Sequence, residues 1–280
     1  MKLIDGKKQA NDIKEKLKKE ISTLKAKGII PTLAIILVGH DPASEIYVKN
    51  KIKTCDELGI CTLLYRFTEE SSEKEIIAQI KDLNEDDGID GILIQSPLPA
   101  IFNEDKIISY VDPKKDVDGF GINNLGALLS NNELIIAATP LGILKMLENE
   151  SVSLEGKNVV VVGASRIVGR PMATLLLNRG ATVTICHNKT KNLKEITSNA
   201  DILIIAIGQA KFITSDFVKE GAVVIDVGIN RIDNHLYGDV DFDSVSKKAS
   251  LITPVPGGVG PMTIVMLLSN VVDVAKRRAK

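Results

Sequence analysis

The sequence predicts an α/β protein with two domains. Apolar runs of strand length alternate with helical patterns along almost the whole chain. The strand runs are apolar nearly throughout, which is typical of parallel sheets covered by helices on both faces. They form two series separated by a less regular stretch, and a chain of 280 residues is long enough for two medium-sized cores.

The first series occupies residues 12–95. Ile13, Leu17, Ile21 and Leu24 share one face of a predicted helix. We then expect a strand TLAIILV at 32–38, a helix from 42 to about 58, a strand CTLLYRF, a helix from about 72 to 84, and a strand DGILIQ.

The second series follows a stretch of loops and short helical segments at about 112–147, which we interpret as the connection between domains. Its predicted elements are the strands NVVVVG, TVTICH, DILIIAIG, AVVIDVG and LITP, with a helix that ends near Gly180 after the first of them. A final helix at about 262–277 is apolar on one side, at Ile264, Leu267, Leu268, Val271, Val272 and Ala275.

Composition excludes several function classes. The chain has 35 Lys and Arg against 36 Asp and Glu, so its charge gives no reason to expect a nucleic-acid or membrane partner. Its three cysteines and three histidines lack the spacings of a disulfide framework or a metal site. The charged start MKLIDGKKQAND and the lack of an apolar run near 18 residues argue against a signal peptide and a membrane span, so we expect a cytoplasmic protein.

A glycine turn follows the first strand of the second series. The segment GASRIVG has Gly163 at the turn and Gly169 on the presumed helix, whose first amides could receive a pyrophosphate. The match to G-x-G-x-x-G is imperfect because Ser165 stands where glycine is expected and Gly169 is one position late. A glycine-punctuated turn without any cofactor is the alternative.

The next strand end indicates which dinucleotide would bind. An NAD site usually has an acidic residue about 20 residues after the glycine turn, whereas this chain reads CHNKTKN there. The side chains that could accommodate a 2′-phosphate are His187, Asn188, Lys189 and Lys191, with help from Arg166 or Arg170. We therefore expect NADP rather than NAD, and solvated loop cations are the alternative.

Three polar positions stand out in the first half. Tyr47 and Lys51 lie four residues apart, hence on one helix face, after an N-cap signal in Asp41 and Pro42. Gln95 ends a strand, where open α/β sheets bind ligands. DVDGF at 116–120 and TPVPGGVGPMT at 253–263 complete the set, although each of these features alone also reads as an ordinary surface, cap or turn.

Taken together, these motifs carry a family resemblance. They occur in the order YVKNK, GILIQSPLP, PKKDVDGF, TPLGI, GASRIVGRPMA, GAVVIDVGIN, GDVDF and ITPVPGGVGPMT. The set covers nearly the full chain and closely resembles the bifunctional methylenetetrahydrofolate dehydrogenase / methenyltetrahydrofolate cyclohydrolase family.

The resemblance implies two reactions in one cleft. A hydride passes from 5,10-methylenetetrahydrofolate to NADP+, and water then opens the methenyl product to 10-formyltetrahydrofolate. Lys51 is the implied principal catalytic residue, with Tyr47 beside it and Gln95 holding it. A lysine that is partly removed from water beside a cationic substrate should lose its proton more readily and serve as a base. Asp118 is the implied partner of the pterin N–H and amino groups.

The resemblance also implies the remaining binding residues and the domain division. The expected cofactor-binding residues are Gly163, Ala164, Ser165, Arg166, Ile167, Gly169, His187, Asn188, Lys189, Thr190, Gly208 and Ile229. The expected substrate-binding residues are Tyr47, Lys51, Ile94, Gln95, Ser96, Asp118, Pro256, Gly257, Gly258, Val259 and Gly260. Residues 1–138 with a returning helix at 262–280 would form the catalytic domain, and 139–261 a Rossmann-type NADP-binding domain. The family implies a homodimer that acts in one-carbon metabolism and supplies purine, methionine and histidine biosynthesis.

Some positions depart from the family pattern. Gly121 stands where many members have histidine and Ser96 replaces the leucine of QLPLP; Ala127, Ala138, Ala164 and Asn188 are further departures. A monofunctional dehydrogenase and a non-catalytic NADP- or folate-binding homologue are alternatives, although the presence of Lys51 and Asp118 argues against them. A shikimate-type dehydrogenase is the fold-level alternative and has no reason to retain PVPGGVG.

Overall fold

The computed structural model describes residues 1–233 and 235–278. It divides into two compact units. The N-terminal unit comprises Asp12–Ala138 and Leu267–Lys280, and the C-terminal unit comprises Met1–Asn11 and Thr139–Met266. The sequence-based division keeps residues 1–138 together, and the structure differs at this point because strand β1 (Lys2–Leu3) pairs with β11 (Leu251–Ile252) of the C-terminal unit.

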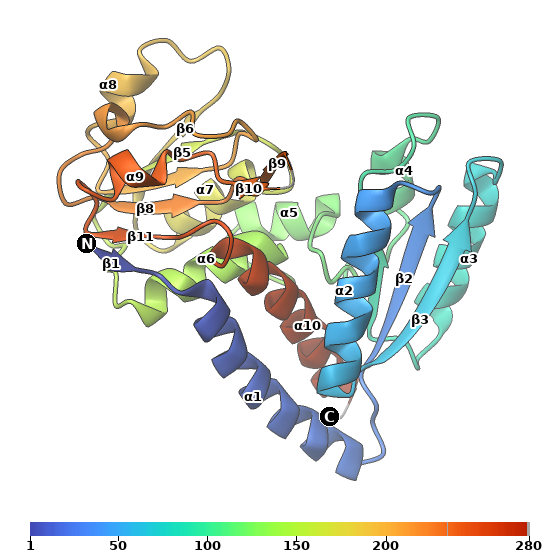
Figure 1. Ribbon diagram of the computed structural model, residues 1–280. Helices are drawn as coiled ribbons and strands as arrows, with labels where there is room; N and C mark the ends of the chain where they lie inside the picture. The colour runs from blue at the N-terminus through green and yellow to red at the C-terminus, as the bar shows by residue number, and fades with distance from the viewer. Residues whose placement is uncertain (234, 279–280) are drawn as a thin grey trace. The chain divides into compact units, whose positions relative to one another are not determined.

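The N-terminal unit is built on a three-stranded parallel sheet. Its elements are β2 (Thr32–Val38), α2 (Pro42–Leu58), β3 (Cys61–Phe67), α3 (Glu73–Glu85), β4 (Gly91–Ile94), α4 (Glu104–Ile108) and α5 (Ile122–Leu129). The strand order is β3-β2-β4, so the two crossovers run in opposite directions. Right-handed connections then place α2 and α3 on opposite faces of the sheet, as Figure 1 shows.

Alternation along β2 sorts its side chains between the two faces. Ala34, Ile36 and Val38 pack with Ile76 and Ile80 of α3 in one apolar cluster. The intervening side chains of β2 are buried as well. A strand with both faces covered reads as a continuous apolar run, which is why the sequence reveals it.

The C-terminal unit contains a six-stranded sheet in the order β1-β11-β8-β7-β5-β6, with every pair parallel. Its further elements are α6 (Ala138–Asn149), β5 (Asn158–Val162), α7 (Gly169–Asn178), β6 (Thr182–Cys186), α8 (Leu193–Thr197), β7 (Ile202–Ile205), η1 (Ser215–Phe217), β8 (Val223–Asp226), β9 (Asn230–Ile232), β10 (His235–Tyr237) and α9 (Phe242–Val245). Helices α1 (Gly6–Ala26) and α10 (Val259–Arg278) each contain a boundary between the units.

The strand order reverses at β5. The chain proceeds from β5 to β6 on one side and returns to β7 on the other. In doubly wound sheets such a reversal opens a crevice at the carboxyl ends of the two strands, and dinucleotides bind there. The glycine turn at 163–169 begins at the end of β5 and therefore lies at this point.

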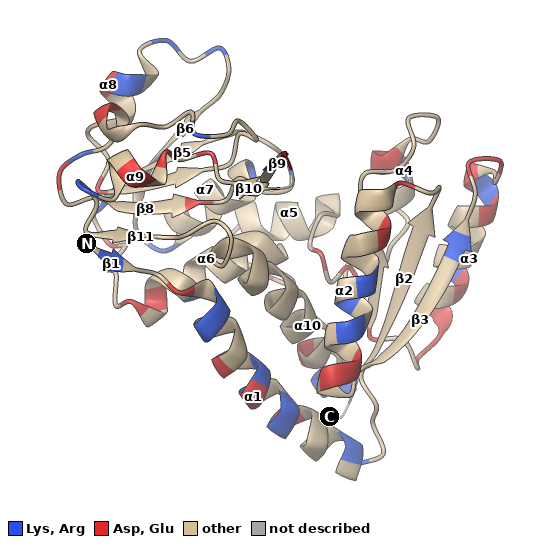
Figure 2. Ribbon diagram, viewed as in Figure 1, with Lys and Arg blue, Asp and Glu red and all other residues tan. Residues whose placement is uncertain are grey.

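The predicted long strands and helices are confirmed, with ends that shift by a few residues. The final helix begins at Val259, three residues before the predicted start. Contrary to the sequence-based expectation, α10 is long and apolar enough by composition to cross a membrane, but 56 % of its apolar window is buried inside the structure, which is typical of a core helix. Acidic and basic residues are interleaved along α1 and α3 (Figure 2), in keeping with the near-zero net charge.

Candidate active site

Helix α2 carries the predicted lysine. Asp41 caps the helix by accepting the Ser44 N–H at 2.8 Å, and Pro42 follows at the first turn, as the sequence predicts. Tyr47 is 46 % exposed, and Lys51 is partly buried one turn further along the same face. The cap thus fixes where the helix begins and which face presents this pair.

Gln95 links Lys51 to the end of β4. The Lys51 Nζ donates to Gln95 Oε1 at 3.1 Å, and Gln95 Nε2 donates to the Ser96 carbonyl oxygen at 2.7 Å. Gln95 is buried, so its amide is held at both ends. The orientation of Gln95 consequently leaves its oxygen facing the lysine, which is the arrangement that the family resemblance implies.

Glu104 fixes the loop that follows Gln95, and sequence reasoning did not identify it. Its carboxylate accepts from the Ser96 hydroxyl at 2.9 Å and from the Leu98 N–H at 2.8 Å. Nothing in the sequence marks this residue, because an acidic side chain in the first turn of a short helix is an ordinary surface feature.

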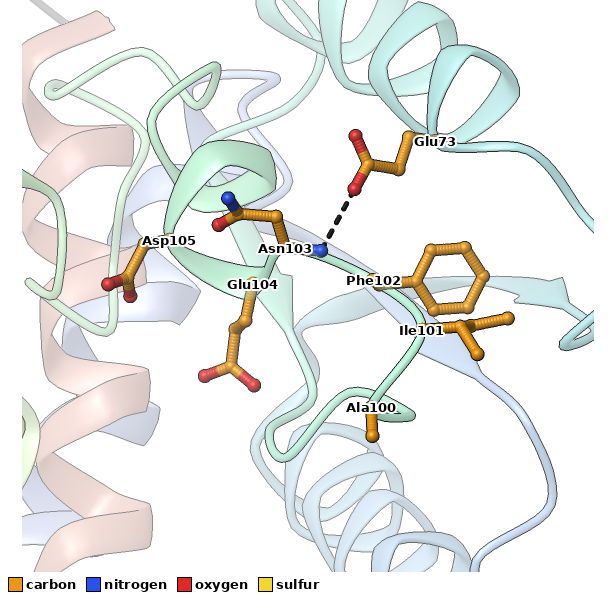
Figure 3. Close-up of a pocket in the computed structure, with 7 residues that line it drawn as sticks. All are labelled: Glu73, Ala100, Ile101, Phe102, Asn103, Glu104 and Asp105. Carbon is orange, nitrogen blue, oxygen red and sulfur yellow. Dashed lines mark hydrogen bonds between the residues drawn. The ribbon is translucent and has the colours of Figure 1, made fainter.

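Glu104 also lines an open hollow of about 610 Å³, together with Glu73, Asn103, Asp105 and residues 100–102 (Figure 3). Glu73 accepts the Asn103 N–H at 2.9 Å and pairs with Lys106. The hollow is lined by none of the sequence-predicted site residues. Glu73 and Glu104 are both occupied with protein donors, which indicates a structural role for these two acids.

The two acids of the DVDGF loop, Asp116 and Asp118, have different surroundings. The Asp116 carboxylate accepts from the Gly119 and Gly121 backbone N–H groups, at 3.1 and 2.7 Å, and from Asn124 Nδ2 at 2.9 Å. Within residues 1–233 and 235–278, no donor contacts the Asp118 carboxylate. Asp116 thereby shapes the loop, and Asp118 is left available to a ligand.

Burial raises the pKa of Asp118 to about 6; the positive charge of Lys51 opposes the rise, and Asp116 adds to it. The carboxyl lies beside a small cavity that is also lined by Ile92, Ile94 and Phe120. A carboxylate in this position gains most from a ligand that brings paired N–H donors. The structure therefore brings together Tyr47, Lys51, Ile94, Gln95, Ser96 and Asp118 in the N-terminal unit.

The glycine turn of the C-terminal unit fits a phosphate-bearing ligand. Gly163 has φ 123°, and a Cβ there would overlap the Ala206 carbonyl, so only glycine suits the position. Ser165 Oγ accepts the Val168 and Gly169 N–H groups at 3.2 and 3.3 Å. Across the described chain, the backbone amides of Ala164 and Ser165 have no protein acceptor. These amides suit a ligand that supplies its own acceptor oxygens.

The turn after β6 presents His187, Asn188 and Lys189 to solvent. Thr190 Oγ1 accepts the His187 N–H at 2.9 Å, and the Lys189 N–H donates to His187 Nδ1 at 3.1 Å. These bonds fix the turn while leaving the lysine side chain unpaired within the part of the chain that the structure describes.

The other predicted site residues also belong to the C-terminal unit. Arg166 and Ile167 lie in the glycine turn, Gly208 follows β7, and Ile229 follows β8. The segment Pro256–Gly260 leads into α10, with Gly257 at φ 105° and a Gly258 Cβ that would lie 2.5 Å from the Pro254 oxygen. The role of this segment toward a folate stays a prediction. No group of three or more His, Cys, Asp or Glu residues that could hold a metal ion occurs among the described residues.

Comparisons with known proteins decide the family. The model of the tetrahydrofolate dehydrogenase/cyclohydrolase catalytic domain matches residues 4–118, and that of the family's NAD(P)-binding domain matches residues 137–279. The chain belongs to the tetrahydrofolate dehydrogenase/cyclohydrolase family.

Relatives in this family match along their full length. A protein of Agathobacter rectalis named bifunctional protein FolD is 55 % identical over 98 % of this chain and 99 % of its own. The crystal structure of a bifunctional methylenetetrahydrofolate dehydrogenase/cyclohydrolase from Campylobacter jejuni is 52 % identical, covers 99 % of both chains and superposes with a TM-score of 0.98.

More distant structures in the comparison bear on the cofactor and on the fold. The Trypanosoma brucei dehydrogenase-cyclohydrolase, complexed with NADP and an inhibitor, is 34 % identical over 99 % of this chain and 98 % of its own, with a TM-score of 0.95. A shikimate dehydrogenase from Aquifex aeolicus is 15 % identical with a TM-score of 0.52, covering 90 % of this chain and 98 % of its own. That likeness shows the fold alone, and the family match overturns the shikimate alternative.

Proposed function

We propose that this protein oxidises 5,10-methylenetetrahydrofolate with NADP+ and hydrolyses the resulting 5,10-methenyltetrahydrofolate to 10-formyltetrahydrofolate. The observation that carries the proposal is the Lys51–Gln95 hydrogen bond, which is found in the same unit as the unpaired Asp118. Full-length relatives named as bifunctional support both activities.

Asp118 would orient the folate for both steps. Its carboxylate accepts the pterin ring N–H and the 2-amino group as a pair, which directs the one-carbon bridge toward the lysine. NADP+ supplies the acceptor that takes the hydride from the methylene carbon. The Ala164 and Ser165 amides and the glycine turn would hold its pyrophosphate, and the absence of an acid at 187–190 leaves room for a 2′-phosphate.

Lys51 would handle the protons of the second step. Its amino group would relay the proton released by the water that adds to the methenyl carbon, and the C–N5 bond then breaks while N5 receives a proton. The formyl group stays on N10, and one proton is released overall. Gln95 keeps the lysine amine at a fixed place during both transfers, because its own amide is held by the Ser96 carbonyl.

We further propose a cytoplasmic homodimer, without nucleic-acid or membrane partners, that supplies one-carbon units to purine, methionine and histidine biosynthesis. The family resemblance supports the dimer, and the net charge of −1 supports the lack of a polyanionic partner. Size-exclusion chromatography with light scattering tests the dimer, and a monomer at micromolar concentration would contradict it.

One assay tests the catalytic proposal. The protein is supplied with 5,10-methylenetetrahydrofolate and either NADP+ or NAD+, while NAD(P)H and methenyl absorbance are recorded together. We expect NADPH to form without matching accumulation of the methenyl product. If the methenyl product accumulated in equal amount to NADPH, the protein would have dehydrogenase activity without cyclohydrolase activity. If no NAD(P)H formed, the proposed function would be wrong.

A further inference from the structure

Two buried carboxylates stand at the carboxyl end of β8 and outside the roles assigned above. Asp226 is the last residue of β8, and Asp239 follows β10 in the GDVDF motif. Asp239 is fully buried and Asp226 is 4 % exposed. Buried acids are costly unless donors surround them, so their partners indicate what they do.

The Asp239 carboxylate accepts hydrogen bonds from the loop after β7. It accepts from three successive backbone N–H groups, those of Ile207, Gly208 and Gln209, at 2.7, 3.0 and 2.8 Å. Successive amides that converge on one point form a nest, an arrangement that binds anions. Here the anion is the protein's own carboxylate, so the shape of this loop depends on it.

The same carboxylate reaches the loop after β8. Asn230 Nδ2 donates to Asp239 Oδ1 at 3.0 Å, directly after Ile229. Strands β7 and β8 are parallel neighbours, so their carboxyl ends share one edge of the sheet. Asp239 therefore ties together two loops at the edge where a doubly wound sheet binds its ligand.

Asp226 holds Asp239 in place. It accepts the backbone N–H groups of Asp239 and Val240, each at 2.9 Å, and that of Gly228 at 3.0 Å. A Cβ at Gly228 would overlap the Asp239 carboxyl, and one at Gly238 would overlap the Asp226 carboxyl. Glycine at both positions permits the close approach of the two acids.

The strand order decides which half of the dinucleotide these loops would meet. The pyrophosphate turn follows β5, and the turn suited to the adenosine ribose follows β6 at one edge of the sheet. The other half of the molecule must then extend to the opposite side of β5, over β7 and β8. Gly208, Gln209 and Ile229 are exposed there.

We propose that Asp239 is a positioning residue for the nicotinamide half of NADP, acting through the loops at 206–209 and 227–230, with Asp226 holding it in place. This inference rests on the proposed NADP-dependent function. The acid contacts no cofactor itself; its removal lets the two loops move apart and deprives the nicotinamide of its preformed surface.

The test compares two ligands by isothermal titration calorimetry. NADP+ contains both halves of the dinucleotide, whereas 2′,5′-ADP lacks the nicotinamide half. The variants are Asp239→Asn, which turns a donor toward the nest, and Asn230→Ala, which removes the tie between the loops together with a longer hydrogen bond from Asn230 to the Tyr237 carbonyl oxygen. Asp243→Asn is the control, since it removes an exposed carboxylate on α9 with the same change in charge.

We expect Asn230→Ala and Asp239→Asn to raise the Kd for NADP+ by about tenfold or more, with the Kd for 2′,5′-ADP and the folate KM unchanged. A general loss of structure would weaken the binding of NADP+ and of 2′,5′-ADP alike, and that result would overturn the inference. Unchanged NADP+ affinity in the folded Asn230→Ala variant would overturn it too, even if Asp239→Asn does not fold. Failure of the wild-type protein to bind NADP+ would instead contradict the proposed function.

Discussion

Replacement of the Asp118 carboxyl is expected to raise the stability of the fold and to abolish folate binding. The carboxyl is partly buried, lacks a donor within the described residues, and has its pKa raised to about 6. Replacement with asparagine keeps the shape of the side chain and removes the buried charge. We expect Asp118→Asn to be more stable than the wild type and to lose folate binding.

The magnitude follows from the change in pKa. A rise from the ordinary 3.8 to about 6 corresponds to about 3 kcal/mol, at 1.36 kcal/mol per pKa unit. Because the side chain is partly exposed, we expect a gain of about 1–3 kcal/mol at pH 7.5. The folded pKa lies above the unfolded one, so the native state binds the extra proton between about pH 4 and pH 6. The wild type therefore loses this stability as the pH rises through that window, and below pH 4 the two proteins should be equally stable.

Urea unfolding at pH 7.5 and pH 4 measures the difference, with Asp87→Asn as a control. Asp87 is an exposed acid of the same unit, and its replacement should change stability at neither pH. The reasoning would be refuted if Asp118→Asn were no more stable than the wild type at pH 7.5, or if its gain persisted undiminished at pH 4.

Three further predictions concern catalysis, cofactor choice and the glycine turn. Lys51→Met should abolish methenyl hydrolysis while a folate still binds, and normal hydrolysis would exclude Lys51 as the proton carrier. The KM for NADP+ should be lower than that for NAD+, since no acid follows β6; equal values in steady-state assays would remove the case for a phosphate pocket at 187–191. Gly163→Ala should lower the free energy of unfolding by about 2 kcal/mol or more, because of its φ of 123° and the overlap with Ala206; an unchanged urea midpoint would contradict this.

The sequence reveals elements whose burial imposes a pattern. Strands β2 and β5 are covered on both faces and read as unbroken apolar runs, so their positions could be predicted. The hairpin of β9 and β10 has three residues in each strand and is mostly polar, and β1 has only two residues. Such segments carry too few side chains for a periodicity to emerge, and pairing with distant strands defines them instead.

For the functional site, prediction from the sequence meets a different limit. The motif DVDGF contains two acids, and the sequence alone does not say how they differ, although the family resemblance selects Asp118. The structure supplies the reason, since the loop amides occupy Asp116 and leave Asp118 without a donor among the described residues. Asp239 accepts backbone N–H groups that are distant in sequence, and only the fold brings those groups to it. Glu104 accepts the N–H of nearby Leu98, but no sequence pattern marks it.

The pairing of β1 with β11 has a consequence for the order in which the chain can assemble during synthesis. The ribosome adds Lys2 and Leu3 to the chain long before it adds their partners Leu251 and Ile252. The three-stranded sheet needs only residues 32–94 and could form while translation continues. The six-stranded sheet must wait, because closing a loop of about 250 residues precedes its last pairing. Strand β1 is thus synthesised early and paired late.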